Sequence, residues 1–266
     1  MAEAMSRNSS NLRLSGKIAI ITGGASGIGE ATAHVFANEG ASHVVIADIQ
    51  DELGNQVATS IGNQRCTYIH CDVADEDQVK NLIQSTVNTY GQVDIMFTNA
   101  GIFSPTDQTV LKLDMSQLDR LFTINVRGMA LCVKHAAHAM VEGRIRGSIV
   151  CTGSVHSSHG FLRSTDYTMS KHAVLGLMRA ASVQLAAHGI RVNCVSPNGL
   201  ATPLTCKLLG VSKEKAQETY KGYARLEGVV LTPKHVADVV LFLASNDAEF
   251  VTGLDLSVDG GFAYGK

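Results

Sequence analysis

The sequence has few of the features that identify membrane-spanning or secreted proteins. No segment reaches the ~18 consecutive apolar residues needed to cross a bilayer. Residues Met1 to Gly16 contain no apolar run of signal-peptide length. We therefore expect a soluble, cytoplasmic protein with no membrane partner. A short organelle-targeting arm stays open as an alternative, against which the acidic Glu3 argues.

The chain also has no strong excess of charge and no metal-ligand spacing. Its 22 lysines and arginines are scattered and balanced by 24 aspartates and glutamates, so we expect no nucleic-acid partner. The ten histidines form no His-Glu-x-x-His pattern, and the six cysteines lie mostly in apolar runs, where a thiol behaves as a small hydrophobic group. We predict neither a metal site nor a disulfide framework.

No Pro/Gly/Ser-rich linker, internal repeat or low-complexity segment divides the chain. With 266 residues, 45% hydrophobic and 17% charged, the chain can bury a large core. We therefore expect residues 1–266 to form a single domain.

Short apolar, β-branched runs alternate with segments of helical periodicity along the whole chain. The runs predict seven strands, at residues 17–22, 43–47, 66–70, 94–98, 148–152, 191–195 and 254–258. The segments between them predict helices at residues 27–38, 51–60, 75–90, 115–141, 167–188 and 233–245. This alternation predicts an α/β fold: a doubly wound (Rossmann) domain with a seven-stranded parallel sheet. Residues 201–230, the longest stretch between strands, are expected to form a helical substrate flap.

A glycine-rich turn, Thr-Gly-Gly-Ala-Ser-Gly-Ile-Gly, follows the first predicted strand and opens the first predicted helix. In that context Gly23 permits a tight turn, Gly27 lets the backbone approach phosphates, and Gly29 lets helix and strand pack closely. The helix N-terminus offers amide donors and a positive dipole to a pyrophosphate. A tight turn without a ligand is the alternative.

Asp48 stands nineteen residues after Gly29, at the end of the second predicted strand. A carboxylate there can bind the adenosine ribose hydroxyls and would repel a 2′-phosphate. Ala25 and Ser26 provide no cation in the turn for such a phosphate. The sequence therefore favours NAD over NADP; a cap that ends the strand is the other interpretation of Asp48.

Tyr167 and Lys171, four residues apart, would lie on one face of a helix. A lysine, helped by an oxidised nicotinamide, can lower the pKa of a tyrosine from its ordinary ~10 and make the phenol a general base or acid. Ser154 can donate a hydrogen bond to the reacting oxygen, and Asn125 can hold a water that relays protons from Lys171. Alone, a Tyr/Lys pair is usually a solvated helix face.

Taken together and in this order, the glycine turn, an Asn-Ala-Gly segment and these four residues resemble the short-chain dehydrogenase/reductases, over residues 16–261. The resemblance implies hydride transfer between a nicotinamide and an alcohol or carbonyl, with catalytic roles for Asn125, Ser154, Tyr167 and Lys171. It also implies a homotetramer. The cofactor contacts that it implies are Gly23, Ser26, Gly27, Ile28, Gly29, Asp48, Asp72, Val73, Asn99, Ala100, Gly101, Tyr167, Lys171, Pro197, Leu200 and Thr202.

Two positions depart from the family pattern. Thr98 stands where the family commonly has an Asn before Asn-Ala-Gly, and Asn198 follows Pro197 where Gly is usual. The backbone at Asn198 either differs from that of the family or keeps the same turn, since Asn tolerates unusual φ/ψ values.

The loops that follow the predicted strands carry many apolar side chains and few charges, which favours a small apolar substrate. His156 and His159 either polarise a second substrate oxygen or only fill space. Residues 167–205 resemble the plant branch of the family that acts on specialised metabolites, including secoisolariciresinol, isopiperitenol and nepetalactol-related enzymes. That likeness implies NAD-dependent oxidation of a cyclic monoterpenoid alcohol or lactol. The alternatives are a redox-neutral cyclase or isomerase that keeps NAD as a structural element, and a non-catalytic dinucleotide-binding protein.

Overall fold

The computed structural model describes residues 12–264. Most of the N-terminal segment, on which the expectation of no signal peptide and the targeting-arm alternative rest, lies outside the described residues. Within residues 12–264, no helix combines the length and the apolar character needed to cross a membrane.

One sheet of seven parallel strands, in the order β3-β2-β1-β4-β5-β6-β7, runs through the centre of the described residues. This confirms the predicted doubly wound α/β fold. The strands are β1 Ile18–Thr22, β2 His43–Asp48, β3 Cys66–His70, β4 Ile95–Thr98, β5 Ser148–Thr152, β6 Arg191–Pro197 and β7 Asp255–Val258. Their order reverses between β1 and β4, and in such sheets ligands bind at the carboxyl ends of the strands beside that point.

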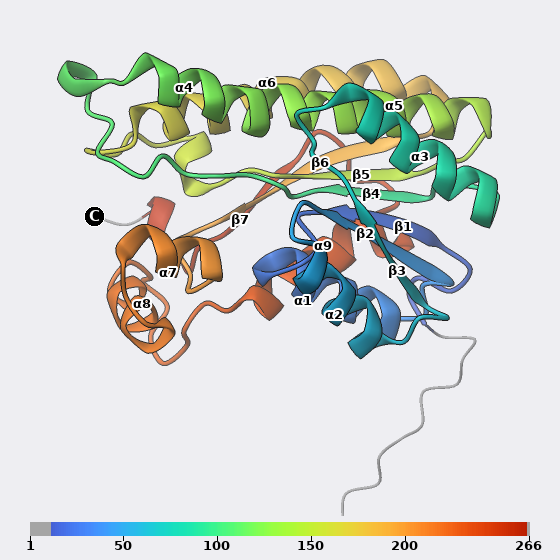
Figure 1. The fold of residues 1–266 in the computed structure, drawn as a ribbon, viewed down its shortest axis with the longest axis horizontal. Coiled ribbons are helices and arrows are strands. Elements are labelled where there is room, and N and C mark those ends of the chain that lie inside the picture. Colours follow the sequence, from blue (N-terminus) through green and yellow to red (C-terminus); the bar gives the residue numbers. More distant parts are fainter. Residues whose placement is uncertain (1–11, 265–266) are drawn as a thin grey trace, which may run out of the picture.

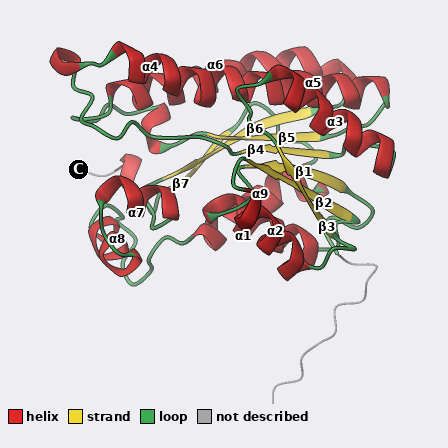
Figure 2. Ribbon diagram, in the orientation of Figure 1, coloured by secondary structure: helices red, strands yellow, loops and turns green. Residues whose placement is uncertain are grey.

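Helices cover both faces of the sheet (Figure 1). Helices α3, α4, α5 and α6 lie on one side, and α1, α2 and α9 on the other, as Figure 2 also shows. The helices are α1 Gly27–Asn38, α2 Asp51–Ile61, α3 Glu76–Tyr90, α4 Met115–Phe122, α5 Met129–Glu142, α6 Thr165–Leu185, α7 Pro203–Leu209, α8 Lys213–Lys221 and α9 Pro233–Ala244.

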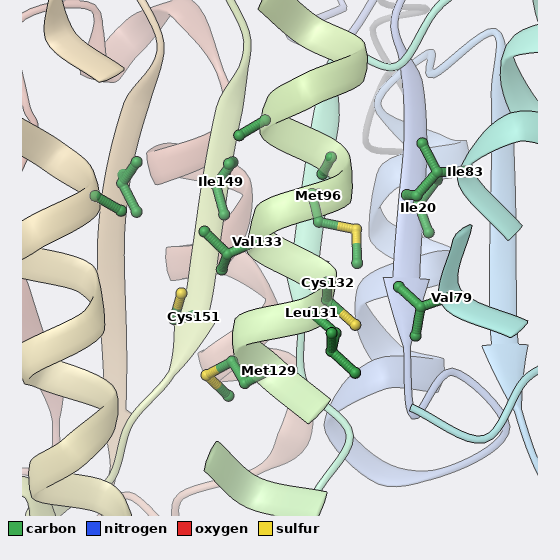
Figure 3. Packing of buried hydrophobic residues seen from close by; sticks show 14 of the residues in the cluster. Ile20, Val79, Ile83, Met96, Met129, Leu131, Cys132, Val133, Ile149 and Cys151 are labelled. Atoms are coloured by element: carbon green, nitrogen blue, oxygen red, sulfur yellow. The ribbon is translucent and has the colours of Figure 1, made fainter. Parts of the chain in front are cut away.

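Two apolar clusters, one on each face, hold these layers together. Figure 3 shows the first: side chains of β1, β4 and β5, such as Ile20, Met96 and Ile149, meet residues of α3 and α5, such as Ile83 and Val133. Strands covered on both faces need apolar side chains on both, which is why the fully buried β1 and β4 appear in the sequence as nearly continuous apolar runs.

The predicted helix at residues 115–141 is interrupted. Helices α4 and α5 are joined by a π-helical segment, Thr123–Gly128, which contains Asn125. Such wide turns occur mostly as single insertions in α-helices, and often at functional sites. Helix α6 also begins earlier than predicted, at Thr165, so that Tyr167 lies within its first turn.

Residues 201–230 contain helices α7 and α8, which lie beside the carboxyl end of the sheet (Figures 1 and 2). Thr202 caps α7 by accepting a hydrogen bond from the Thr205 amide, and Pro203 occupies the first turn. Gly210, with φ +63°, ends the helix in the left-handed conformation. These residues are therefore helical, as predicted, and their role as a substrate flap remains a prediction.

Candidate active site

The glycine turn lies between β1 and α1, at the point where the strand order reverses. A Cβ at Gly29 would lie 2.1 Å from the Gly23 carbonyl oxygen, and one at Gly23 would lie 2.9 Å from Ala100 Cα. Gly23 and Gly27 have positive φ values of 65° and 59°. Residues other than glycine rarely adopt such values. Packing and conformation thus both require these glycines.

Asn99 clamps this turn to the end of β4. Its side-chain amide donates to the carbonyl oxygens of Thr22 and Gly23, each at 3.2 Å. The Thr22 hydroxyl in turn accepts hydrogen bonds from the Asn99 and Ala100 amides. The Asn99 side chain is therefore occupied in shaping the turn, so a contact between Asn99 and the coenzyme remains a prediction.

Asp48 is 8% exposed at the end of β2. Its carboxylate accepts a hydrogen bond of 3.1 Å from the Ala25 amide in the glycine turn. The other oxygen accepts bonds from the Gln50 amide and side chain, at 3.1 and 3.2 Å. The charge is thus held beside the turn on which we expect the coenzyme.

Asp72 and Val73, two further expected cofactor contacts, follow β3. Asp72 accepts a hydrogen bond from the Ala74 amide. The Val73 side chain is buried in the first apolar cluster, against Gly128. Any contact of Val73 with adenine would therefore be made by its main chain.

At the end of β6, Asn198 keeps an ordinary backbone. The only non-glycine residue with positive φ among residues 12–264 is Arg144, so Asn198 does not use the unusual φ/ψ tolerance that we had considered. Its side-chain oxygen accepts the Gly199 amide at 2.8 Å, and its amide contacts the Asp259 carbonyl oxygen at 3.4 Å. The side chain thus ties the loop after β6 to the segment after β7.

Beyond Asn198, the chain returns to the glycine turn. A Cβ at Gly27 would lie 3.3 Å from Thr202 Cβ. The buried Leu200 accepts a hydrogen bond from Thr205 through its carbonyl oxygen. Pro197, Leu200 and Thr202, three of the expected cofactor contacts, therefore lie along a segment that leads from β6 to the turn.

The residues present fit a dinucleotide. The glycine turn leads directly into the N-terminus of α1. Ser26, at the N-cap of α1, makes no side-chain capping bond, so its hydroxyl can bind a phosphate oxygen. Asp48 stands at the place where a ribose would lie. A dinucleotide bound at this turn would be held by Gly23, Ser26, Gly27 and Asp48.

Lys171 is 3% exposed on α6. Its ammonium donates a 2.8 Å hydrogen bond to the Thr152 carbonyl oxygen at the end of β5. The Thr152 hydroxyl donates to the Asn99 side chain at 3.3 Å. A chain of hydrogen bonds therefore connects the glycine turn, through Asn99 and Thr152, to Lys171.

Tyr167 lies one helical turn before Lys171 and is 9% exposed. Its ring stacks on Phe103 at 3.8 Å between centroids and meets the edge of His156 at 5.0 Å. Lys171 Nζ lies 5.4 Å from the centre of the Tyr167 ring. The spacing of the two residues in the sequence thus places them on one helix face, as predicted.

Burial raises the pKa of Tyr167, and the nearby Ser154 hydroxyl opposes this with a smaller effect. The lowering of the Tyr167 pKa that we expected from Lys171 is therefore not produced by the protein alone. The physical reason is desolvation, which disfavours the charged form of a buried phenol.

Ser154 follows β5 and begins a short 3-10 helix, Val155–Ser157. Its hydroxyl oxygen accepts a hydrogen bond of 3.2 Å from the His156 amide. Because that bond uses a lone pair, the hydroxyl can still donate its proton to an oxygen beside Tyr167, the phenol oxygen or that of a substrate.

His156 packs between Phe161, at 3.7 Å, and Tyr167, and its Nδ1 lies 3.0 Å from the Thr168 hydroxyl. Burial, followed by the charge of Lys171, lowers the pKa of His156 to about 4. The imidazole is therefore neutral at physiological pH. His159 lies farther out, with its ring 6.2 Å from that of Phe262.

Asn125 is fully buried, and its carboxamide binds both main-chain groups of Ile102, at 2.8 and 2.9 Å. Its Nδ2 also lies 3.5 Å from the Ser170 hydroxyl. The side chain therefore positions the loop after β4. The relay water that we expected at Asn125 remains a prediction, and it would have to bind atoms that Ile102 does not use.

The sequence analysis missed a buried pair beside Tyr167. Asp166 is 1% exposed; it accepts the Tyr167 amide at 2.7 Å and a short hydrogen bond from the Ser104 hydroxyl. Ser104 follows Phe103, whose ring stacks on Tyr167. The pair therefore fastens the loop after β4 to α6. Nothing in the polar segment Ser-Thr-Asp-Tyr signals that this carboxylate is buried.

The buried ammonium of Lys171 predicts a pH-dependent stability. Desolvation lowers its pKa from 10.5 to about 8. Between these pH values the unfolded chain binds more protons than the folded one, so this residue's contribution to the free energy of unfolding rises with pH and is smallest below pH 8. We expect wild type to gain on the order of 3 kcal/mol relative to Lys171→Met between pH 7.5 and 10.5.

Urea unfolding of both proteins at the two pH values measures this gain, because the titrations of groups that lie away from Lys171 cancel in the difference. The exposed Lys134→Met is the control and is expected to show no such gain. A difference between wild type and Lys171→Met that does not change with pH would contradict the prediction.

The comparisons with known proteins agree over nearly the whole chain. A family model described as enoyl-(acyl carrier protein) reductase matches residues 23–263. The chain is 55% identical over 251 residues to a (+)-cis,trans-nepetalactol synthase of Nepeta racemosa, with 93% of this chain and 94% of that protein covered. It is also 55% identical over 249 residues to the mitochondrial (-)-isopiperitenol/(-)-carveol dehydrogenase of Mentha piperita, with 94% of each covered.

Among solved structures, a short-chain type dehydrogenase/reductase from Mycobacterium marinum superimposes with a TM-score of 0.87 at 33% sequence identity. The match covers 97% of this chain and 100% of that one. The sequence comparison and the structure comparison therefore both match this chain over more than nine-tenths of its length.

Proposed function

Because the chain belongs to the short-chain dehydrogenase/reductase family, we propose that it oxidises a small apolar cyclic alcohol or lactol of the monoterpenoid class with NAD. The observation that carries the proposal is the arrangement around Tyr167: a buried phenol, with the Lys171 ammonium 5.4 Å from its ring centre and the Ser154 hydroxyl close by. The names of the two relatives supply the substrate class.

In this mechanism Tyr167 takes the proton from the substrate hydroxyl, and Ser154 donates a hydrogen bond to the same oxygen. Lys171, held by the Thr152 carbonyl oxygen at 2.8 Å, stabilises the phenolate that forms. Bound NAD would supply the hydride acceptor and a positive charge near the phenol. The Phe103 ring, which stacks on Tyr167, and the Phe161 ring, which stacks on His156, give the proposed site apolar walls beside the phenol.

The family uses nicotinamide coenzymes, and we infer a preference of this chain for NAD from Asp48. Its carboxylate is held beside the glycine turn by the Ala25 amide, at 3.1 Å. A 2′-phosphate would meet a like charge there. Helices α7 and α8 form, in this proposal, the flap that covers the substrate.

The second candidate is a redox-neutral cyclase or isomerase, which the likeness to a nepetalactol synthase favours. Here Ser154 and Tyr167 would hold the oxygens of a reactive enol or dialdehyde and guide ring closure, with NAD kept as a structural element. No net oxidation accompanies this reaction, so the two candidates differ in whether NADH forms.

We expect the purified protein to form NADH, followed by its absorbance, when mixed with NAD and a panel of cis,trans-nepetalactol, isopiperitenol and carveol. Absence of NADH with every member of the panel would contradict the dehydrogenase. Conversion of a reactive dialdehyde into nepetalactol without NADH turnover would support the redox-neutral candidate instead.

A homotetramer and a cytoplasmic location complete the proposal. Light scattering coupled to size-exclusion chromatography tests the first, and a monomer would count against it. Cell fractionation tests the cytoplasmic location. Because the Mentha piperita relative is named as mitochondrial, recovery of this protein in mitochondria is the outcome that would contradict a cytoplasmic location.

A further inference from the structure

The loop after β4, residues 102–108, is fastened to the rest of the site at both ends. At its start, the Asn125 carboxamide binds both main-chain groups of Ile102. At its end, the main chain of the buried Gln108 exchanges two hydrogen bonds of 2.9 Å with the chain at the start of α6. Residues 105–107, between these two anchors, are exposed. Exposed loops move more easily than the elements they connect, so a further contact is needed to fix the middle of this loop.

Asp166 supplies that contact from the first turn of α6. One of its carboxylate oxygens accepts the Tyr167 amide at 2.7 Å, which is among the first amides of the helix and has no acceptor within it. The other oxygen accepts a short hydrogen bond from the Ser104 hydroxyl. A negative charge near a helix N-terminus is favourable, and this side chain is only 1% exposed. The carboxylate is therefore fixed in place, and it fixes Ser104 in turn.

The hydrogen bond between Ser104 and Asp166 joins the chain neighbours of two stacked rings. Phe103 comes directly before Ser104, and Tyr167 comes directly after Asp166. The rings of Phe103 and Tyr167 lie 3.8 Å apart between centroids, with 25° between their planes. A movement of the loop away from α6 would therefore separate the two rings. The phenol would then lose the surface that covers one of its faces.

We propose that Ser104 and Asp166 are positioning residues, whose hydrogen bond keeps Phe103 stacked on Tyr167 and so holds the phenol in the orientation that proton transfer needs. This inference rests on the proposed function and adds to it two residues that act through Tyr167. A hydrogen bond to a charged group is stronger than one between neutral groups, which suits a contact that fixes an exposed loop. Catalytic groups work best when they are held within about 0.5 Å of the productive geometry. The pair therefore orders the phenol before the substrate binds.

The test compares Ser104→Ala, Ser104→Thr and the control Thr106→Ala on the alcohol of the panel that wild type oxidises fastest. Ser104→Ala is expected to lower kcat and kcat/KM together by about tenfold, because the alignment of the phenol is lost. Ser104→Thr keeps a hydroxyl and is expected to restore most of the rate. Thr106→Ala removes a hydroxyl of the same loop that binds Gln117 on α4 at 3.2 Å, and it is expected to keep the wild-type rate. The affinity for NADH, titrated by fluorescence, is expected to stay unchanged in all three variants, since the glycine turn is untouched.

A wild-type kcat in Ser104→Ala, or equal losses in Ser104→Ala and Ser104→Thr, would overturn the proposal, because the hydroxyl would then have no part in the rate. An equal loss in Thr106→Ala, or a weaker affinity for NADH in Ser104→Ala, would also overturn it, since the loop or the site as a whole would then be disturbed. If wild type oxidises no alcohol of the panel, the proposed dehydrogenase fails, and crystal structures of Ser104→Ala and Thr106→Ala decide the positioning role. A Phe103 ring displaced from Tyr167 in Ser104→Ala alone supports that role, and any other pair of structures overturns it.

Discussion

Tyr167→Phe is expected to lower kcat for alcohol oxidation by about 10²- to 10⁴-fold, the usual contribution of a positioned general base. Phenylalanine keeps the ring that stacks on Phe103 at 3.8 Å and meets His156 at 5.0 Å. Only the hydroxyl that removes the proton is lost. The measurement is initial-rate NADH formation with saturating NAD and substrate.

Two further measurements show whether the effect is chemical. The affinity for NAD, from fluorescence titration, and the thermal midpoint are expected to stay close to wild type, because the fold and the glycine turn are untouched. Tyr223→Phe removes a phenolic hydroxyl from a side chain that is 46% exposed and that makes no ring contact with Tyr167, and this variant is expected to keep full kcat. A Tyr167→Phe protein that still oxidises at the wild-type rate would remove the phenol from the mechanism.

Asp48→Asn is expected to lower the ratio of kcat/KM with NAD to kcat/KM with NADP by about 100-fold. The carboxylate would face the 2′-phosphate of NADP, and like charges placed together cost several kcal/mol. Each 1.4 kcal/mol is about tenfold in a binding constant. Asparagine has the same size as aspartate and keeps an oxygen that can accept the 3.1 Å hydrogen bond from the Ala25 amide. The glycine turn is therefore expected to keep its shape.

Asp51→Asn is the matched control, with the same change of charge three residues later. Asp51 is exposed and binds His70 at 2.7 Å and Tyr68 at 2.6 Å rather than the glycine turn. We expect its coenzyme ratio to stay at the wild-type value. If the ratio in Asp48→Asn did not change, Asp48 would be the strand-ending cap and not the specificity residue.

These two residues belong to halves of the site that the structure joins through hydrogen bonds. Asn99 holds the carbonyl oxygens of the glycine turn, and Thr152 connects Asn99 to Lys171. The proposed coenzyme end and the proposed proton-transfer end therefore share one element, the carboxyl ends of β1, β4 and β5. In the proposed mechanism, this arrangement lets residues as far apart in the chain as Asp48 and Tyr167 act in one site.

The amino-acid sequence by itself determined the elements of the fold. Apolar runs of β-branched residues, such as residues 43–47, reappear as strands, and the glycine turn lies where its spacing predicts. Tyr167 and Lys171 share a helix face because a four-residue spacing closely matches the helical repeat. All of these are local properties, which depend on neighbouring residues along the chain.

Only the tertiary structure decided how the site works in detail. The interruption of the helix at Asn125, the burial of Lys171 and the Ser104–Asp166 pair each require contacts between distant segments. The raised pKa of Tyr167 arises in the same way, because desolvation depends on what surrounds a side chain in space. Periodicity and spacing carry no information on these contacts, since they form only when the strands and helices pack together.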